Sequence, residues 1–139
     1  PICSNLASPN SVDAVVTFRN LHNWIGPQMD TIFKNSYKAL KPGGIFGIVE
    51  HRANPGTSLD VMKKSGYVTE SYAIAIAEKH GFVLVDKSEI NANPKDLKNY
   101  ERGVWTLPPS LRLKDKDKQK YLEIGESDRM TLLFKKPID

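Results

Sequence analysis

The stretch Leu40-Lys-Pro-Gly-Gly-Ile-Phe-Gly-Ile-Val-Glu50 marks a change from one secondary structure to another. Before it, apolar and small residues recur at helical spacing from Met29 to Leu40, which predicts an amphipathic helix that begins after Gly26-Pro27. After it, residues 45–49 form a short apolar run that predicts a buried strand. The proline and glycines between the two end the helix. A helix followed at once by a buried strand is typical of α/β architecture.

The same alternation continues on both sides of this stretch. Asp13-Ala-Val-Val-Thr-Phe18 is rich in β-branched residues and predicts a buried parallel strand. A second helix is predicted from Ser71 to His80, with Thr69 as its cap and Gly81 at its end. Short connections of this kind favour parallel crossover units. The expected strands lie near residues 13–18, 45–50, 82–90 and 128–135.

Length and composition set the outer limits of function. The chain has 139 residues, 40% of them hydrophobic, and a formal net charge of +4, which predicts one globular domain. No apolar run approaches the roughly 20 residues of a membrane span, so we expect no membrane partner. The lysines are spread along the chain rather than clustered, so we expect no nucleic-acid partner. The single cysteine, Cys3, has no partner for an internal disulfide.

Residues 91–127 interrupt the α/β rhythm with a polar segment that contains three prolines and an aromatic group at Tyr100 and Trp105. A loop of this length in a compact domain usually has a function. Both of its ends should lie at the carboxyl edge of the sheet, which favours a substrate lid. We therefore divide the chain into residues 1–90 (strand-helix-strand-helix-strand), 91–127 (insertion or lid) and 128–139 (last strand).

The Phe18-Arg-Asn20 run after a strand, the helix that closes in Leu40-Lys-Pro-Gly-Gly44, and the strand that ends at Glu50 resemble the second half of class I S-adenosylmethionine-dependent methyltransferases. The wider string, including Gly103-Val-Trp-Thr-Leu-Pro-Pro109, is similar to a bacterial family of predicted methyltransferases. The resemblance implies the C-terminal half of a Rossmann-like methyltransferase fold, mostly parallel, with an antiparallel last strand inserted between the second and third strands.

The cofactor motif of that family does not occur in the printed sequence. Its glycine-rich turn leaves a strand and opens a helix, whereas Gly43, Gly44 and Gly47 follow a helix and enter a strand. We therefore expect a C-terminal half that is inactive alone, within a parent protein that uses S-adenosylmethionine. We expect it to pair with the missing N-terminal half or with another copy. A cytoplasmic location is expected, and a periplasmic one stays open.

Candidate site residues follow the predicted strands, because ligands of open α/β sheets bind beyond the carboxyl ends of the strands. The resemblance implies that the first loop borders the cofactor and the substrate. The predicted cofactor-binding residues are Phe18, Arg19, Asn20 and Trp24. The predicted catalytic residues are His22, Glu50 and His51, which supply proton-transfer groups. The predicted substrate-binding residues are Asn23, Arg52, Tyr100, Arg102 and Trp105.

Structural alternatives stand beside these roles. Trp24 can cover the helix, Glu50 and Arg52 can form an ordinary ion pair at the end of the sheet, and Trp105 can anchor the insertion by packing. The three histidines lack metal-ligand spacing, so no metal site is predicted.

The predicted function is S-adenosylmethionine-dependent methyl transfer to a small-molecule acceptor. The alternative is a non-enzymatic α/β binding module that has kept a methyltransferase-like fold.

Overall fold

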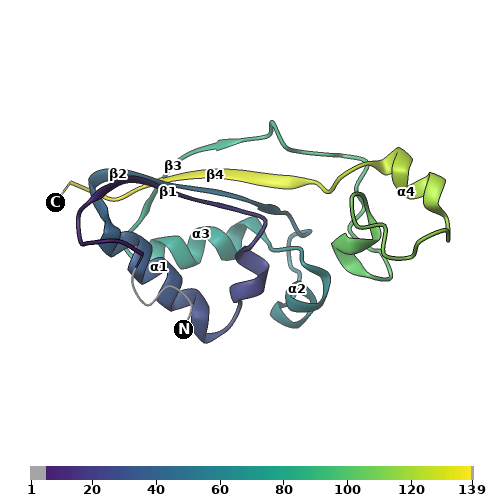
Figure 1. Ribbon diagram of the computed structural model, residues 1–139, viewed down its shortest axis with the longest axis horizontal. Coiled ribbons are helices and arrows are strands. Elements are labelled where there is room, and N and C mark those ends of the chain that lie inside the picture. Colours follow the sequence, from purple (N-terminus) through teal and green to yellow (C-terminus); the bar gives the residue numbers. More distant parts are fainter. Residues whose placement is uncertain (1–5, 139) are drawn as a thin grey trace.

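The computed structural model describes residues 6–138, and in it the helices α1 and α3 lie on one side of a four-stranded sheet (Figure 1). The strands are β1 (Val12–Phe18), β2 (Leu40–His51), β3 (Val83–Ser88) and β4 (Arg129–Lys135), in the spatial order β1-β2-β4-β3. β1 is parallel to β2, and β4 is antiparallel to both β2 and β3. The predicted insertion of an antiparallel last strand between the second and third strands is confirmed. Cys3 lies outside the described residues.

Two helices connect these strands. α1 (Pro27–Ala39) has Pro27 at its first turn and buries Met29, Ile32 and Phe33, as the apolar stripe predicts. α3 (Glu70–Lys79) is capped by Thr69, whose side chain accepts a hydrogen bond from the backbone N–H of Tyr72. The shorter helices are α2 (Leu59–Ser65) and α4 (Lys118–Ile124).

Four phenylalanines form a cluster within the core between the helices and the sheet. Phe33 of α1, Phe46 of β2, Phe82 before β3 and Phe134 of β4 are each at most 2% exposed. Their rings contact one another at centroid distances from 5.1 to 6.5 Å. Burying a side chain of this size contributes about 1.5–3 kcal/mol, so this cluster holds α1 and the segment between α3 and β3 against β2 and β4.

Three details differ from the sequence prediction. The aperiodic segment after β1 contains a 3-10 helix, η1 (Leu21–Trp24), because Leu21 is drawn into the core and is 1% exposed. β3 ends at Ser88, two residues before the predicted strand end. The run from Lys41 to Gly44 does not separate helix from strand but already belongs to β2.

The predicted insertion forms a docked unit rather than a free loop. Its 3-10 helix η2 (Gly103–Thr106) packs on α2, and Gly103 has a φ of +60°. A Cβ on Gly103 would lie 2.5 Å from the carbonyl oxygen of Ser65, so the close approach requires glycine. Farther along, the Tyr67 hydroxyl donates to the Asp96 carboxylate at 2.9 Å.

Within the described part of the chain, no helix is long and apolar enough to cross a bilayer.

Candidate functional site

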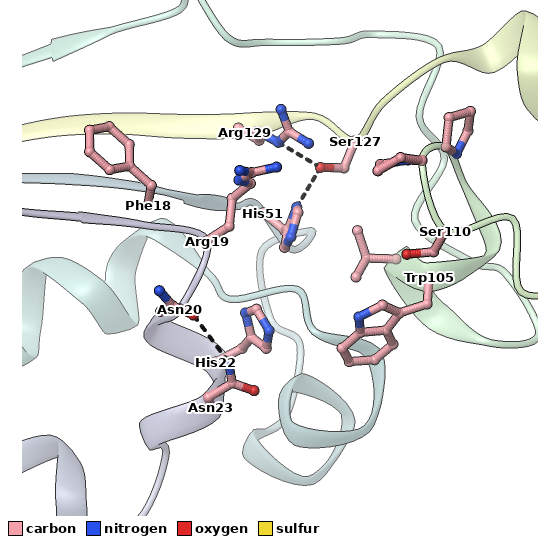
Figure 2. A pocket seen from close by; sticks show the side chains of 13 residues that line it. Phe18, Arg19, Asn20, His22, Asn23, His51, Trp105, Ser110, Ser127 and Arg129 are labelled. Atoms are coloured by element: carbon pink, nitrogen blue, oxygen red, sulfur yellow. Dashed lines mark hydrogen bonds between the residues drawn. The ribbon is translucent and has the colours of Figure 1, made fainter. Parts of the chain in front are cut away.

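A cavity of about 440 Å³ opens where β1 and β2 end and β4 begins (Figure 2). Four segments line it: the β1-η1 turn, the end of β2, the middle of the insertion at residues 104–110, and residues 127–129 at the start of β4. This arrangement brings residues 127–129 and residues 104–110 to the edge at which the first two strands end. The described residues that line it are Phe18, Arg19, Asn20, His22, Asn23, His51, Val104, Trp105, Pro108, Pro109, Ser110, Ser127 and Arg129.

His22 is held against a buried carboxylate. The Nδ1 atom of His22 lies 2.9 Å from Oε2 of Glu50, whose side chain is fully buried. The same carboxylate accepts the backbone N–H of His22 at 2.6 Å and that of His51 at 2.8 Å. Glu50 does not line the cavity itself. It therefore fixes the orientation of the His22 ring, whose Nε2 stays available as an acceptor.

His51 lies beside His22 and forms part of a second polar chain. The two imidazole centroids are 5.6 Å apart. Nδ1 of His51 lies 2.5 Å from the hydroxyl oxygen of Ser127, and Nε of Arg129 donates to the same oxygen at 3.1 Å. Burial first, and then the charges of His22, Arg129 and Arg19, lower the pKa of His51 to about 3. The imidazole of His51 is neutral at physiological pH.

The predicted cofactor residues divide between two adjoining cavities. Phe18 and Asn20 line both the cavity already described and a second one of about 280 Å³, which Trp24 also lines. The second cavity contains two buried hydroxyls, Thr17 Oγ1 and Ser36 Oγ, without a hydrogen-bond partner. Unsatisfied buried hydroxyls beside an exposed amide and an indole fit a ligand with both polar and aromatic parts, and S-adenosylmethionine is such a ligand.

Three of the predicted substrate residues are not part of the first cavity. Tyr100 packs its ring on Tyr121, 5.8 Å away, and Arg102 lines a separate small cavity with Lys64. Arg52 is bound by carboxylates of Asp128, Glu70 and Glu89 at 2.7 to 2.9 Å.

The alternative of a Glu50–Arg52 ion pair is wrong. Glu50 is turned to His22, while Arg52 is held by the three carboxylates that meet at the start of β4 and α3.

Asn23 and Trp105 line the first cavity, and substrate binding by them stays a prediction. Trp105 presents its edge to His22, with ring centroids 5.8 Å apart. Sequence reasoning did not select Arg129, Ser110 or the two prolines before it. The only sequence signal for these residues is their position within, or directly after, a long insertion that returns to the ligand edge.

The two histidines and Glu50 also come close enough to suggest a metal. One potential ligand atom from each of His22, Glu50 and His51 falls within 4.8 Å of the others. Local spacing in the sequence predicts no metal site, because 28 residues separate His22 from Glu50. The Glu50 carboxylate accepts three N–H groups, so a metal would compete with these donors for its oxygens.

Comparison with known proteins relates the chain to one fold. No protein-family model matches the sequence, and no curated protein matches it. Among solved structures, the cyclase SpnF superposes with a TM-score of 0.64 at 16% identity, covering 98% of this chain and 54% of that one. A sarcosine dimethylglycine methyltransferase from Galdieria sulphuraria, described as putative, superposes with a TM-score of 0.60 at 16% identity, covering 96% and 56%.

A phosphoethanolamine N-methyltransferase 2 from Haemonchus contortus, solved with S-adenosyl-L-methionine, gives a TM-score of 0.56 at 21% identity and covers 97% of this chain and 35% of that one. The chain thus spans about a third to just over half of these relatives. Identities this low establish the fold alone. The chain has an α/β fold resembling methyltransferase domains, and its structural neighbours are mostly methyltransferases.

Proposed function

We propose that the protein takes part in methyl transfer from S-adenosylmethionine to a small molecule, with His22 as the base that removes a proton from the acceptor. The observation that carries this proposal is the His22–Glu50 pair at 2.9 Å, at the carboxyl edge of a methyltransferase-like sheet. The buried carboxylate orients the ring and stabilises the imidazolium that forms when Nε2 takes a proton. Glu50 acts through His22 rather than on the substrate.

The cofactor, when bound, supplies the methyl group, and Phe18, Asn20 and Trp24 are the residues proposed to hold it. They border the cavity with the two unpartnered hydroxyls, next to the cavity that contains the histidines. Adjoining cavities of this kind allow the acceptor to be aligned with the methyl donor, and alignment supplies much of the catalysis in such a transfer. The fold by itself does not decide the reaction, since one neighbour, SpnF, is described as a cyclase.

The direct test is release of S-adenosylhomocysteine by the complete protein over a panel of phenols, amines and hydroxy acids. His22→Asn should lower kcat by about 100-fold or more, which is the usual contribution of a general base. Glu50→Gln should have a smaller effect in the same direction, and Asn20→Ala should weaken cofactor binding. The matched control is His80→Asn, because His80 lies at the end of α3 and pairs with Asp30.

The competing function, a binding module without catalysis, makes the opposite prediction. It would release no S-adenosylhomocysteine with any acceptor, while the fold and ligand binding remained intact. Equal losses for the His22, Asn20 and His80 variants that follow thermal stability would show that these positions are structural.

A second test concerns the 139 residues alone. We propose that they supply only part of the cofactor contacts, because the glycine-rich turn typical of the family does not occur in the printed sequence. Part of the contacts must then offset the full cost of association. Calorimetric titration of this chain with S-adenosylmethionine should give no saturable heat at micromolar concentrations, and a one-to-one micromolar isotherm would contradict the proposal.

A further inference from the structure

The first cavity contains two guanidinium groups whose positive charge is not balanced by a carboxylate among the described lining residues. Of the described residues that line it, Arg19 and Arg129 are the permanently charged ones and none is a carboxylate. The Arg19 side chain has no hydrogen-bond or ion-pair partner among the described residues. Its backbone has a φ of +57°, which is uncommon for a non-glycine residue, and its N–H donates to Val49 at 2.7 Å. This conformation directs the side chain toward the cavity.

Arg129 faces the same point from β4. Figure 2 shows the guanidinium groups of Arg19 and Arg129 turned toward His51 and Ser127. Nη2 of Arg129 pairs with Glu126 at 2.8 Å, but the Glu126 side chain is 55% exposed, so this surface pair is screened by solvent. The planar fork of arginine fits carboxylate and phosphate oxygens.

The hydrogen-bond chain assigns a donor role to His51. Arginine donates only, so the Ser127 oxygen accepts from Arg129, and Nδ1 of His51 is the one acceptor among the described residues to which the buried Ser127 hydroxyl can donate. A neutral imidazole that accepts at Nδ1 carries its hydrogen on Nε2. His51 therefore offers an N–H donor next to the two guanidinium groups, whereas His22 offers an acceptor at Nε2.

These charges favour an anion over a metal ion. Arg19 and Arg129 are close enough to His51 to oppose a positive charge on its ring, and the same repulsion acts twice as strongly on a divalent cation. The Glu50 carboxylate already accepts three N–H groups. The cavity as built attracts negative charge.

We propose that the molecule bound in this cavity is a small hydroxy acid, whose anionic group lies between Arg19 and Arg129 and whose hydroxyl faces His22. The two imidazoles are 5.6 Å apart, so the anionic group and the hydroxyl must be close neighbours in the ligand. Trp105 and the two prolines add an apolar wall that suits a flat or compact carbon skeleton. This inference rests on the proposed methyl transfer, because it names the class of acceptor.

A second source of the anionic group is the carboxylate of the cofactor itself. The geometry favours the acceptor. Of the two arginines, only Arg19 lies beside the residues proposed for the cofactor at the end of β1, whereas Arg129, Ser127 and Trp105 line the first cavity from the β4 and insertion side and do not line the second.

The experiment compares 2-hydroxybenzoate with its neutral amide, 2-hydroxybenzamide, in NMR titrations that follow the arginine Nε–H signals of the protein. The acid should bind at least about tenfold more tightly than the amide, since one strong charged contact is worth about this much. Arg19→Gln and Arg129→Gln should each reduce that preference to about twofold or less. Lys34→Gln, on the exposed side of α1, removes the same charge and should leave the preference unchanged.

Each other outcome has a defined meaning. Equal binding of the two probes, no binding of either, or an equal loss with Lys34→Gln would overturn the proposal. If Arg129→Gln does not fold, Arg129→Lys keeps the charge without the Nε donor and should still weaken the preference.

Titration with S-adenosylmethionine and its decarboxylated analogue distinguishes the two sources. Arginine variants that affect only the carboxylated cofactor would assign the anionic group to the cofactor and refute the acceptor proposal. Because binding is read without turnover, selective acid binding together with no methyl transfer would contradict the proposed function and not the anion site.

Discussion

His51 is 8% exposed and lies among Arg19, Arg129 and His22, which together with burial set its protonation. In the unfolded chain this histidine binds a proton at its ordinary pKa of 6.5, but in the folded protein its pKa is about 3. The folded state therefore gains stability from His51 above pH 6.5 and loses it as the pH falls toward 3.

At pH 5 this linkage should lower the free energy of unfolding by about 2 kcal/mol relative to neutral pH. His51→Gln should flatten the pH dependence between about pH 6.5 and 5, above the range in which most carboxylates titrate. Urea unfolding of both proteins at several pH values measures how the free energy of unfolding depends on pH. Identical slopes for the two proteins would show that His51 is accessible to protons in the folded state.

Asp128 should also make stability depend on pH, in a lower pH range than His51. Burial alone would raise its pKa, but hydrogen bonds from Arg52 and Lys98 lower the pKa of Asp128 to about 2. Its stabilising contribution is present above about pH 4 and is lost as the pH falls toward 2. Asp128→Asn should cost about 1–3 kcal/mol at pH 7 and should make unfolding below pH 4 less steep.

Because Asp128 joins Arg52 to the end of the insertion, limited proteolysis should distinguish a local effect from a global one. Cleavage within residues 91–127 should accelerate in Asp128→Asn before the sheet unfolds. Unchanged cleavage at this segment would mean that the Arg52–Asp128 pair does not anchor the insertion.

At the scale of elements, the contact between α2 and η2 depends on two glycines. Gly103 lies against the backbone of Ser65, and a Cβ on Gly66 would lie 2.9 Å from the ring of Trp105. Gly103→Ala meets backbone rather than a flexible side chain, so it should destabilise the docked insertion by at least about 2 kcal/mol. Gly56→Ala, where nothing lies within 4 Å but φ is also positive, controls for backbone strain alone.

Fluorescence of Trp105, read in a Trp24→Phe background because the chain has a second tryptophan, reports whether η2 stays docked in these variants. Increased solvent quenching in Gly103→Ala but not in Gly56→Ala is the expected result. Similar behaviour of both variants would assign the effect to φ rather than to the close approach.

The elements also show what local sequence can predict. α1 and β2 follow from their periodicity and from proline and glycine at their junction, because both signals act within a few residues. The Ser127–His51 and Arg52–Asp128 contacts each join residues 76 positions apart, and no local spacing encodes them. Glu50, His22 and His51 could be selected as polar residues after strands, but their partners depended on how the insertion returns.

At the scale of the whole molecule, β1 forms an edge of the described sheet, because it pairs with β2 alone among the described strands. Val16 and Phe18 on this strand are 57% and 55% exposed. An apolar strand edge favours pairing with another chain, so we expect the 139-residue chain to self-associate. Val16→Lys should shift light-scattering masses toward the monomer, and a monomeric wild-type chain at high concentration would refute this.

The central place of β4 has a consequence for how the molecule is made. β3 pairs with no described strand other than β4, and β4 also covers the open side of β2. During synthesis the ribosome must therefore extend the chain past residue 129 before β3 can pair at all and before β2, which has β1 on its other side, gains its second neighbour. Because Ser127 and Arg129 arrive with the same strand, the nascent chain completes its sheet and its cavity together, and any chain terminated before that point would have neither.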